Sequence, residues 1–148
     1  MKLIDMLFNL FKKEKMLKIK EVDKSKLKDI FNPKSKTINL TPIQVYVIDE
    51  KYSLGNFESL KAFLKKDFTN LKIYLSEQAD CDDFAIQLWS RFKKINPNFA
   101  FGFAISNSHA FNVFIDDKEK IWIIEPQTDE VFEYKNIKSK YKLKMVII

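Results

Sequence analysis

Two stretches in the middle of the chain have apolar residues at the spacing of an amphipathic helix. The first, "FESLKAFLKKDF", follows Asn56, a residue type that caps helices, and the second starts at Cys81. "INPN" comes after the second stretch, and its proline cannot continue a helix. The spacing predicts two helices, whose apolar faces carry Phe57, Leu60, Phe63 and Leu64 in the first and Cys81, Phe84, Ala85, Leu88, Trp89 and Phe92 in the second.

Beyond the second helix the period of the pattern changes from about 3.6 residues to about 2. Alternating runs follow one another there, separated by short polar turns: "FAFGFAI", "HAFNVFID", "KIWIIEP", "EVFEY" and "LKMVII". A further alternating run, "IQVYVID", precedes the first helix. Because helices come first and most strands later, the order predicts an α+β domain. We expect the Cys81 helix to pack on an antiparallel sheet of about four to six strands.

The N-terminal part has a different character. "MKLIDMLFNLFKK" places apolar residues on one face of a helix over residues 1–13, and a Lys-rich connector with a short helix near "KSKLKDIF" follows. We therefore divide the chain into residues 1–40 and an α+β domain over 41–148. Asp5 and Asn9 interrupt any signal-peptide core, and no apolar run reaches the roughly 20 residues of a membrane span. Packing of the N-terminal helix on the domain or on a partner is favoured, and contact with a membrane surface is the alternative.

The chain of 148 residues carries a formal net charge of +6, but the charge by itself does not indicate a nucleic-acid partner. Nearly all of the excess is lysine spread along the chain, and arginine occurs once, at Arg91. Proteins that read base edges rely on arginine, so we expect no nucleic-acid partner. A single cysteine cannot form an internal disulfide, and we expect a reduced, cytoplasmic protein. Gly55 and Gly102 are the only glycines, which excludes a glycine-rich phosphate loop.

One cysteine and one histidine are present, so Cys81 and His109 either act as a pair or neither is catalytic in that way. A cysteine nucleophile needs an imidazole to take its proton and a third group to orient the imidazole. Asp80 is placed as N-cap and Asp83 as its capping-box partner, which makes Cys81 the first helical residue. There the helix dipole and the unpaired backbone N–H groups favour a thiolate and an oxyanion, whereas the nearby aspartates oppose a thiolate.

A predicted hairpin supplies the candidate third group. If the turn "IDDKE" is centred near Asp117, the numbers of paired residues sum to about 234, and His109 lies opposite Glu125. A carboxylate at that position orients the imidazole. A shift of the register by about one or two residues makes Asp116 or Gln127 the neighbour instead.

At these residues the sequence resembles a known family. "CDDFAIQLW" followed by "HAFNVFIDDKEKIWIIEPQ" is similar to the motif pair of the transglutaminase-like superfamily, within the papain-like cysteine-enzyme fold. The likeness covers roughly residues 76–130. It implies a papain-like α+β fold with Cys81 as nucleophile, His109 as base and Glu125 as third member. Glu125 stands where the family usually has Asp, and Phe111 where it has Trp. A looser likeness to small uncharacterised phage-borne proteins, some of them labelled lectin-like, carries no mechanism.

These observations predict a hydrolase or acyl transferase that acts on an amide or peptide bond through a thioester on Cys81, with a protein or peptide as substrate. Candidate supporting residues are Gln78, Asp82, Asn112 and Gln127. We expect no cofactor and no metal, because one cysteine and one histidine with carboxylates do not assemble a structural zinc site.

Two alternatives come from other functional classes. The first is a noncatalytic binding module on the same fold, such as a phage or host-interaction protein, which would work in the host-cell cytoplasm. The second is a basic adaptor that contacts a membrane surface or nucleic acid through residues 1–13. A buried and unreactive thiol favours the first alternative, and strong salt dependence of binding favours the second.

Overall fold

The computed structural model describes residues 20–33, 42–136 and 138–148, so the helix predicted over residues 1–13 lies outside the described residues. The N-terminal elements are β1 (Lys20–Asp23), α2 (Lys24–Phe31), β2 (Gln44–Tyr46) and β3 (Lys51–Leu54). Two further helices follow, α3 (Phe57–Leu64) and α4 (Cys81–Ile95), with a short 3-10 turn at Thr69–Leu71 between them. The later strands are β4 (Phe101–Ile105), β5 (Ala110–Ile115), β6 (Ile121–Glu125), β7 (Glu130–Glu133) and β8 (Met145–Ile147), with 3-10 turns at Tyr134–Asn136 and Ser139–Tyr141.

Both helices predicted from the apolar spacing are confirmed, and each begins at the expected capping residue. Asn56 Oδ1 accepts a hydrogen bond of 2.7 Å from the backbone N–H of Ser59 at the start of α3. Asp80 is the N-cap of α4, and α4 ends at Ile95, two residues before Pro97. The alternating runs are strands as well, with bounds that differ from the predicted ones by one to three residues.

The six-stranded sheet has the strand order β2-β8-β4-β5-β6-β7. Its neighbouring strands are antiparallel except for β2 and β8, which pair in parallel, so the sheet is mixed. The prediction of a papain-like α+β fold, with N-terminal helices packed on an antiparallel sheet, is therefore wrong. A strand opens the described part of the chain, and the parallel pair places Val45 beside Val146. Alternation in "IQVYVID" predicts a strand but not the direction of its partner, because that partner is about a hundred residues away.

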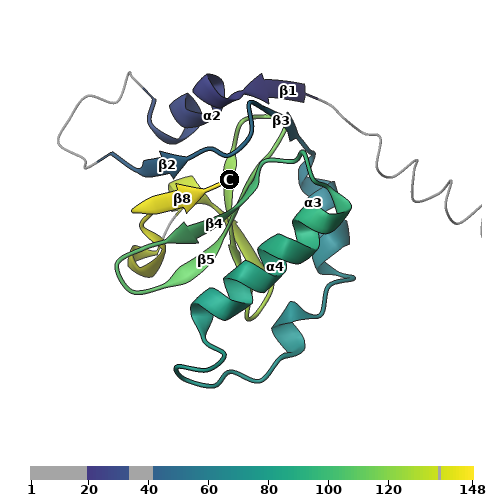
Figure 1. The fold of residues 1–148 in the computed structure, drawn as a ribbon, viewed down its shortest axis with the longest axis vertical. Coiled ribbons are helices and arrows are strands. Elements are labelled where there is room, and N and C mark those ends of the chain that lie inside the picture. Colours follow the sequence, from purple (N-terminus) through teal and green to yellow (C-terminus); the bar gives the residue numbers. More distant parts are fainter. Residues whose placement is uncertain (1–19, 34–41, 137) are drawn as a thin grey trace, which may run out of the picture.

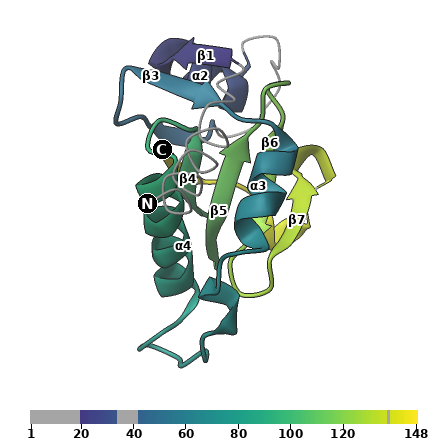
Figure 2. The same ribbon diagram turned by 90° about the vertical axis from the view of Figure 1, so that its right-hand side faces the viewer.

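Structural elements cover both faces of the sheet, as Figures 1 and 2 show. Helices α3 and α4 pack on one face, where Leu88 and Phe92 of α4 contact Phe101 and Phe114 of the sheet. The rings of Phe92 and Phe101 are stacked with centroids 4.1 Å apart. This aromatic packing fixes α4 on the central strands and so positions the start of α4, where Cys81 lies.

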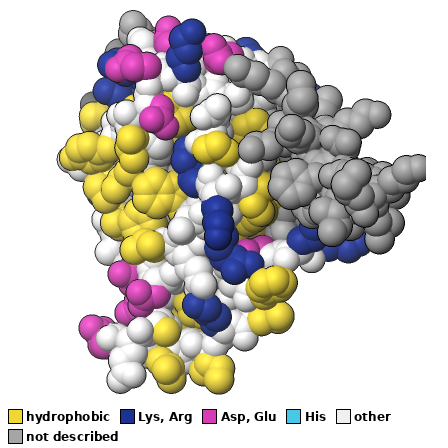
Figure 3. All heavy atoms as spheres, turned by 45° about the vertical axis from the view of Figure 1, so that its right-hand side comes forward, with side chains coloured by type: hydrophobic (Ala, Val, Ile, Leu, Met, Phe, Trp, Pro, Cys, Tyr) yellow, Lys and Arg dark blue, Asp and Glu magenta, His cyan; other side chains and the backbone are white. Residues whose placement is uncertain are grey.

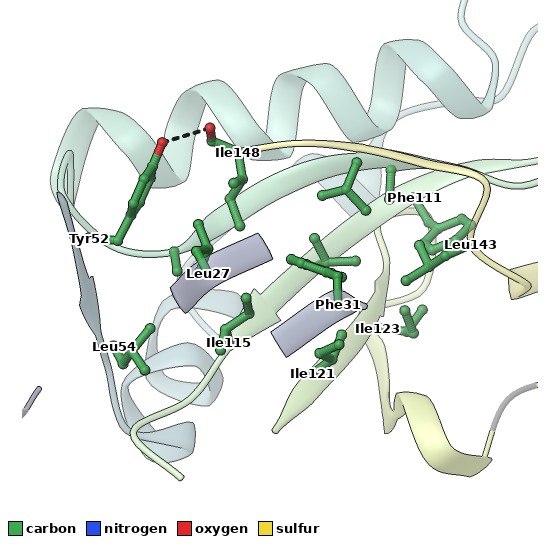
Figure 4. Packing of buried hydrophobic residues seen from close by; sticks show 14 of the residues in the cluster. Leu27, Phe31, Tyr52, Leu54, Phe111, Ile115, Ile121, Ile123, Leu143 and Ile148 are labelled. Atoms are coloured by element: carbon green, nitrogen blue, oxygen red, sulfur yellow. Dashed lines mark hydrogen bonds between the residues drawn. The ribbon is translucent and has the colours of Figure 1, made fainter. Parts of the chain in front are cut away.

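Helix α2 and the two-stranded β1–β3 sheet lie over the opposite face. Figure 4 shows Leu27 and Phe31 of α2 beside Ile115, Ile121 and Ile123 of the large sheet. Burial of these apolar side chains stabilises the second core by about 1.5–3 kcal/mol for each large residue.

Strand β1 and helix α2 fall within the range that the sequence assigned to a connector. The short helix near "KSKLKDIF" is confirmed, while β1 was missed because "KEVD" is four residues long and three of them are charged. The division of the chain at residue 40 stays a prediction. Among the described helices, none combines the length and the apolar character that a membrane crossing requires.

The hairpin of β5 and β6 has a register two residues away from the predicted one. Asn112 pairs with Ile124 and Ile115 pairs with Ile121, so the numbers of paired residues sum to 236. The turn is centred on Lys118 instead of Asp117, and Asp116 Oδ1 holds it by accepting hydrogen bonds of 2.9 Å from the backbone N–H groups of Lys118 and Lys120. This register sets where His109 lies relative to the end of β6.

Candidate functional site around the start of helix α4

Cys81 is the first residue of α4, as the sequence predicts. The backbone N–H of Asp80 donates to Asp83 Oδ2 over 3.3 Å, and the backbone N–H of Phe84 donates to the Asp80 carbonyl over 3.1 Å. These bonds belong to the capping arrangement that starts the helix. The Cys81 side chain is half-buried and packs beside Ala85 and the neighbouring sheet residues.

The acids around Cys81 interact with one another. Asp82 is exposed, and a hydrogen bond with Asp80, slight burial and repulsion from the Asp80 carboxylate raise the pKa of Asp82 above its usual value. A carboxylate oxygen of Asp80, a carboxylate oxygen of Asp82 and Cys81 Sγ all lie within 4.8 Å of one another. The helix start is therefore a compact acidic group, in which ionised carboxylates accept hydrogen bonds and only a protonated carboxyl can donate one.

His109 and Glu125 are in direct contact. His109 Nε2 lies 2.6 Å from Glu125 Oε2, and the two side chains are 14% and 5% exposed. Tyr141 donates its hydroxyl to the same Glu125 oxygen over 2.8 Å, and the backbone N–H of Gln127 donates to Oε1 over 3.3 Å. Lys140 Nζ lies 3.6 Å from Oε2. The Glu125 carboxylate is thus buried with a partner on each oxygen.

This cluster shifts the protonation of its members. Burial by itself would raise the pKa of the Glu125 carboxyl, but the hydrogen bonds from His109 and Tyr141, the attraction of His109 and the Gln127 N–H hold this pKa below its usual value. Burial and the hydrogen bond to Glu125 raise the pKa of the Tyr141 hydroxyl. Glu125 therefore stays charged and Tyr141 stays protonated at neutral pH.

The His109 ring and the Cys81 side chain pack against different clusters. The His109 ring lies against the rings of Phe111 and Tyr141, with centroids 6.0 Å and 5.6 Å away, and both of these residues belong to the core on the α2 side. Cys81 packs in the cluster on the α4 side, with Ala85, Phe103 and Ala110, the last of which directly follows His109. Within the described residues Cys81 Sγ makes no hydrogen bond, and so no hydrogen bond joins it to His109.

The supporting residues predicted from the sequence lie in three different settings. Gln78 is exposed in the turn before α4, where its backbone N–H donates to the Leu75 carbonyl over 3.1 Å. Asn112 is fully buried, and its Nδ2 donates to the carbonyls of Ala85 at 2.9 Å and Gly102 at 3.2 Å. Asn112 therefore ties α4 to β4, and Gln127 holds Glu125 through its backbone.

The contacts of three polar residues, Tyr141, Arg91 and Asp129, were not predicted from the sequence. Tyr141 lies about 30 residues beyond His109 and in a segment without clear periodicity, so no local signal connected the two. Arg91 forms an ion pair with the buried carboxylate of Asp67, which also accepts a hydrogen bond of 2.7 Å from the Thr69 N–H. Burial and repulsion from Asp67 raise the pKa of Asp129 to about 6.

A shallow pocket of about 270 Å³ lies away from Cys81, between the start of α3 and the β5–β6 turn. Its Trp122 ring stacks on Phe57 with centroids 4.0 Å apart, and Trp122 Nε1 donates to Asp116 Oδ2 over 2.8 Å. Both aromatic rings and the Asp116 carboxylate are thereby used for packing and for closing the turn. Trp122 therefore packs against α3 and holds the β5–β6 turn.

No protein-family model matches the chain, and no curated protein sequence matches it. Solved structures do share its fold. One is described as a PSL1a-E64 complex, with a TM-score of 0.67 and 19% identity over 86% of this chain and 51% of that chain. Another is Polyporus squamosus lectin bound to the human-type influenza-binding epitope Neu5Aca2-6Galb1-4GlcNAc, with a TM-score of 0.62 and 18% identity over 86% of this chain and 49% of that one. This chain thus spans about half the length of each.

Polyporus squamosus lectin is among these neighbours, and the likeness contradicts the resemblance to the transglutaminase-like superfamily and to papain-like cysteine enzymes. That resemblance rested on a helix start and a hairpin, which are local features that a different fold can also contain. The prediction of a hydrolase or acyl transferase with Cys81 as nucleophile is contradicted by the same comparison. A protein or peptide substrate is not confirmed.

Proposed function

We propose that this chain is a noncatalytic binding module whose ligand site is the polar surface at the start of α4. The observation that carries the proposal is that the imidazole is hydrogen-bonded to a carboxylate and not to the thiol. His109 Nε2 is held by Glu125, and within the described residues no hydrogen bond connects the imidazole to Cys81 Sγ. Thiol catalysis needs that proton relay, whereas ligand binding does not.

The exposed groups at this surface favour a ligand rich in hydroxyl groups. Asp82 and Gln78 are exposed, and the carboxylate of Asp80 lies beside that of Asp82. Carboxylates accept hydrogen bonds from hydroxyl groups, while the Gln78 amide can donate as well as accept. A carbohydrate presents many hydroxyl groups on a rigid ring, so it can bind several of these side chains at once.

The structural neighbours supply the first probes. One of them is a lectin bound to the trisaccharide Neu5Aca2-6Galb1-4GlcNAc, and this chain covers 49% of that lectin. We extend carbohydrate binding to this chain as part of the proposal. The acidic helix start favours the neutral disaccharide Galb1-4GlcNAc over the sialylated trisaccharide, because the sialic acid carboxylate would be repelled by Asp80 and Asp82.

Calorimetric titration with the two saccharides tests the proposal. We expect the neutral disaccharide to bind more tightly, and Asp82→Asn to weaken its binding by about tenfold, the loss of one hydrogen bond to a charged group. Cys81→Ser should leave binding unchanged. The matched control is Asp49→Asn, at an exposed aspartate that lies outside the α4 start, and it should also leave binding unchanged. Absence of binding to both saccharides, or an equal effect of Asp82→Asn and Asp49→Asn, would contradict the proposal.

A further inference from the structure

The segment between α3 and α4 exposes large apolar side chains close together. Phe68 is 59% exposed, Leu71 76%, Ile73 78%, Tyr74 51% and Leu75 50%, and we call these five residues the apolar strip. Exposed apolar residues scattered singly are ordinary on a protein surface, but five within eight positions are not. Figure 1 places this segment at the lower end of the molecule, and Figure 3 shows apolar side chains at the surface of that end.

The backbone of the apolar strip leaves hydrogen-bonding groups available. Leu75 N–H donates to the Ala79 carbonyl over 2.9 Å, and Lys72 N–H donates to the Thr69 carbonyl over 3.2 Å. Between them, the N–H groups of Ile73 and Tyr74 have no partner within the described residues. An apolar surface with unpaired backbone donors at its centre is suited to contact with another polypeptide.

Charges of opposite sign flank the apolar strip. Lys65 precedes it and Lys72 lies within it, whereas Glu77 and the acids of the α4 start follow it. A surface with positive charge at one end and negative charge at the other is complementary to itself when two copies meet in opposite directions about a two-fold axis. Lys72 of each copy then faces Glu77 of the other.

We propose that the apolar strip is the contact surface between two copies of this chain. A membrane surface fits less well, because the acids that follow the strip would be repelled by anionic lipid. A second copy buries the apolar side chains and pairs both ends of the strip with opposite charge. This proposal does not rest on carbohydrate binding, because none of the five residues of the apolar strip belongs to the ligand site at the α4 start, although Glu77 adjoins that site.

Sedimentation velocity of the full chain over a range of concentrations tests this proposal. We expect a dimer, and we expect Ile73→Asp to weaken the dimer by at least about a hundredfold, because each copy would bury a charge in an apolar contact. Ile95→Asp is the matched control, since Ile95 is also apolar and 53% exposed but lies at the far end of α4. Circular dichroism of both variants verifies that they remain folded.

Charge reversal tests the pairing directly. Lys72→Glu should weaken the dimer by about tenfold, and the double variant Lys72→Glu with Glu77→Lys should restore it to within about threefold of the wild-type affinity. A monomer at all concentrations would overturn the proposal. It would equally be overturned by a dimer that tolerates Ile73→Asp, or by a monomer that binds vesicles of phosphatidylcholine and phosphatidylserine through Ile73.

Discussion

Glu125 and Asp82 are both carboxylates that the sequence places in the candidate site, yet their surroundings differ. Glu125 is 4% exposed, and its two oxygens accept hydrogen bonds from His109, Tyr141 and the Gln127 N–H. Asp82 is exposed and interacts mainly with the carboxylate of Asp80. The pKa of Glu125 is lowered and that of Asp82 is raised. Glu125 thus stabilises the fold through its hydrogen bonds, whereas Asp82 is available to a ligand.

The largest expected effect is on stability, at the buried member of the pair. Glu125→Gln should lower the free energy of unfolding by about 2–3 kcal/mol, because it removes the negative charge and replaces one of the two accepting oxygens by an NH2 group that faces a buried donor. Glu130→Gln is a matched control, since Glu130 pairs with Glu125 across the β6–β7 ladder but is exposed and bonded to Lys138. That control should change stability by less than about 0.5 kcal/mol in urea unfolding. Equal losses in both variants would show that Glu125 does not anchor the cluster.

A smaller loss is expected when Glu125 keeps its charge but loses a single donor. Tyr141→Phe removes the 2.8 Å hydrogen bond while leaving the packing of the ring on Phe132 and Phe111. Urea unfolding should show a loss of about 1–2 kcal/mol. An unchanged stability would mean that the Tyr141 hydroxyl contributes nothing to holding Glu125.

Two carboxyls near the β6–β7 turn, the buried Glu125 and the half-buried Asp129, should give opposite responses to pH. Glu125 has a lowered pKa in the folded state, so its stabilising contribution is present above about pH 4.3 and is lost as the pH falls further. Asp129 has a pKa raised to about 6, so its protonated form favours folding at low pH and this contribution is lost as the pH rises from about 4 to about 6.

Asp129→Asn isolates the second contribution. The variant should be more stable than wild type by about 1 kcal/mol at pH 7 and equal to it near pH 4, because the burial of a charge and the repulsion from Asp67 are removed only where Asp129 is charged. Asparagine also tolerates the positive φ of 59° at this position. Unfolding midpoints measured across this pH range check the prediction, and a constant difference between the two proteins would refute it.

The smallest expected effect on stability is at the exposed member of the comparison. Asp82→Asn should change the free energy of unfolding by less than about 0.5 kcal/mol, since the side chain is solvated. The same variant is the one expected to weaken saccharide binding. Parallel unfolding and binding measurements on Asp82→Asn and Glu125→Gln therefore sharpen the distinction between the two carboxylates. If Asp82→Asn lost as much stability as Glu125→Gln, the two carboxylates would not differ in their contribution to the structure.

Local features of the fold were predictable from the sequence, while distant pairings were not. Asn56, Asp80 and the apolar spacing located α3 and α4, because caps and periodicity depend on residues within a few positions. The parallel pairing of β2 with β8 depends on residues about a hundred positions apart and left no local signal. The register of the β5–β6 hairpin was missed by two residues because the turn is centred on Lys118, where Asp116 accepts the hydrogen bonds of two backbone N–H groups.

The candidate site was predictable to a similar extent. Contact between His109 and Glu125 was expected, although the register places their backbones differently from the predicted pairing. The role of Tyr141 could not be inferred, since the C-terminal segment returns to the sheet through packing rather than through a pattern. A resemblance carried by short motifs led to a catalytic hypothesis, because motifs of this length describe a helix start and a hairpin but not the chemistry between them.

The central claim is that the Cys81 thiol and the His109 imidazole do not act together. The rate of Cys81 alkylation by iodoacetamide, measured against pH in wild type and in His109→Ala, tests this most directly, with Cys81→Ser as a blank. We expect the two pH profiles to coincide, with the rate falling steeply below neutral pH in both proteins. A rate that persists below about pH 7 in wild type and disappears in His109→Ala would establish a thiolate–imidazolium pair and contradict the noncatalytic account.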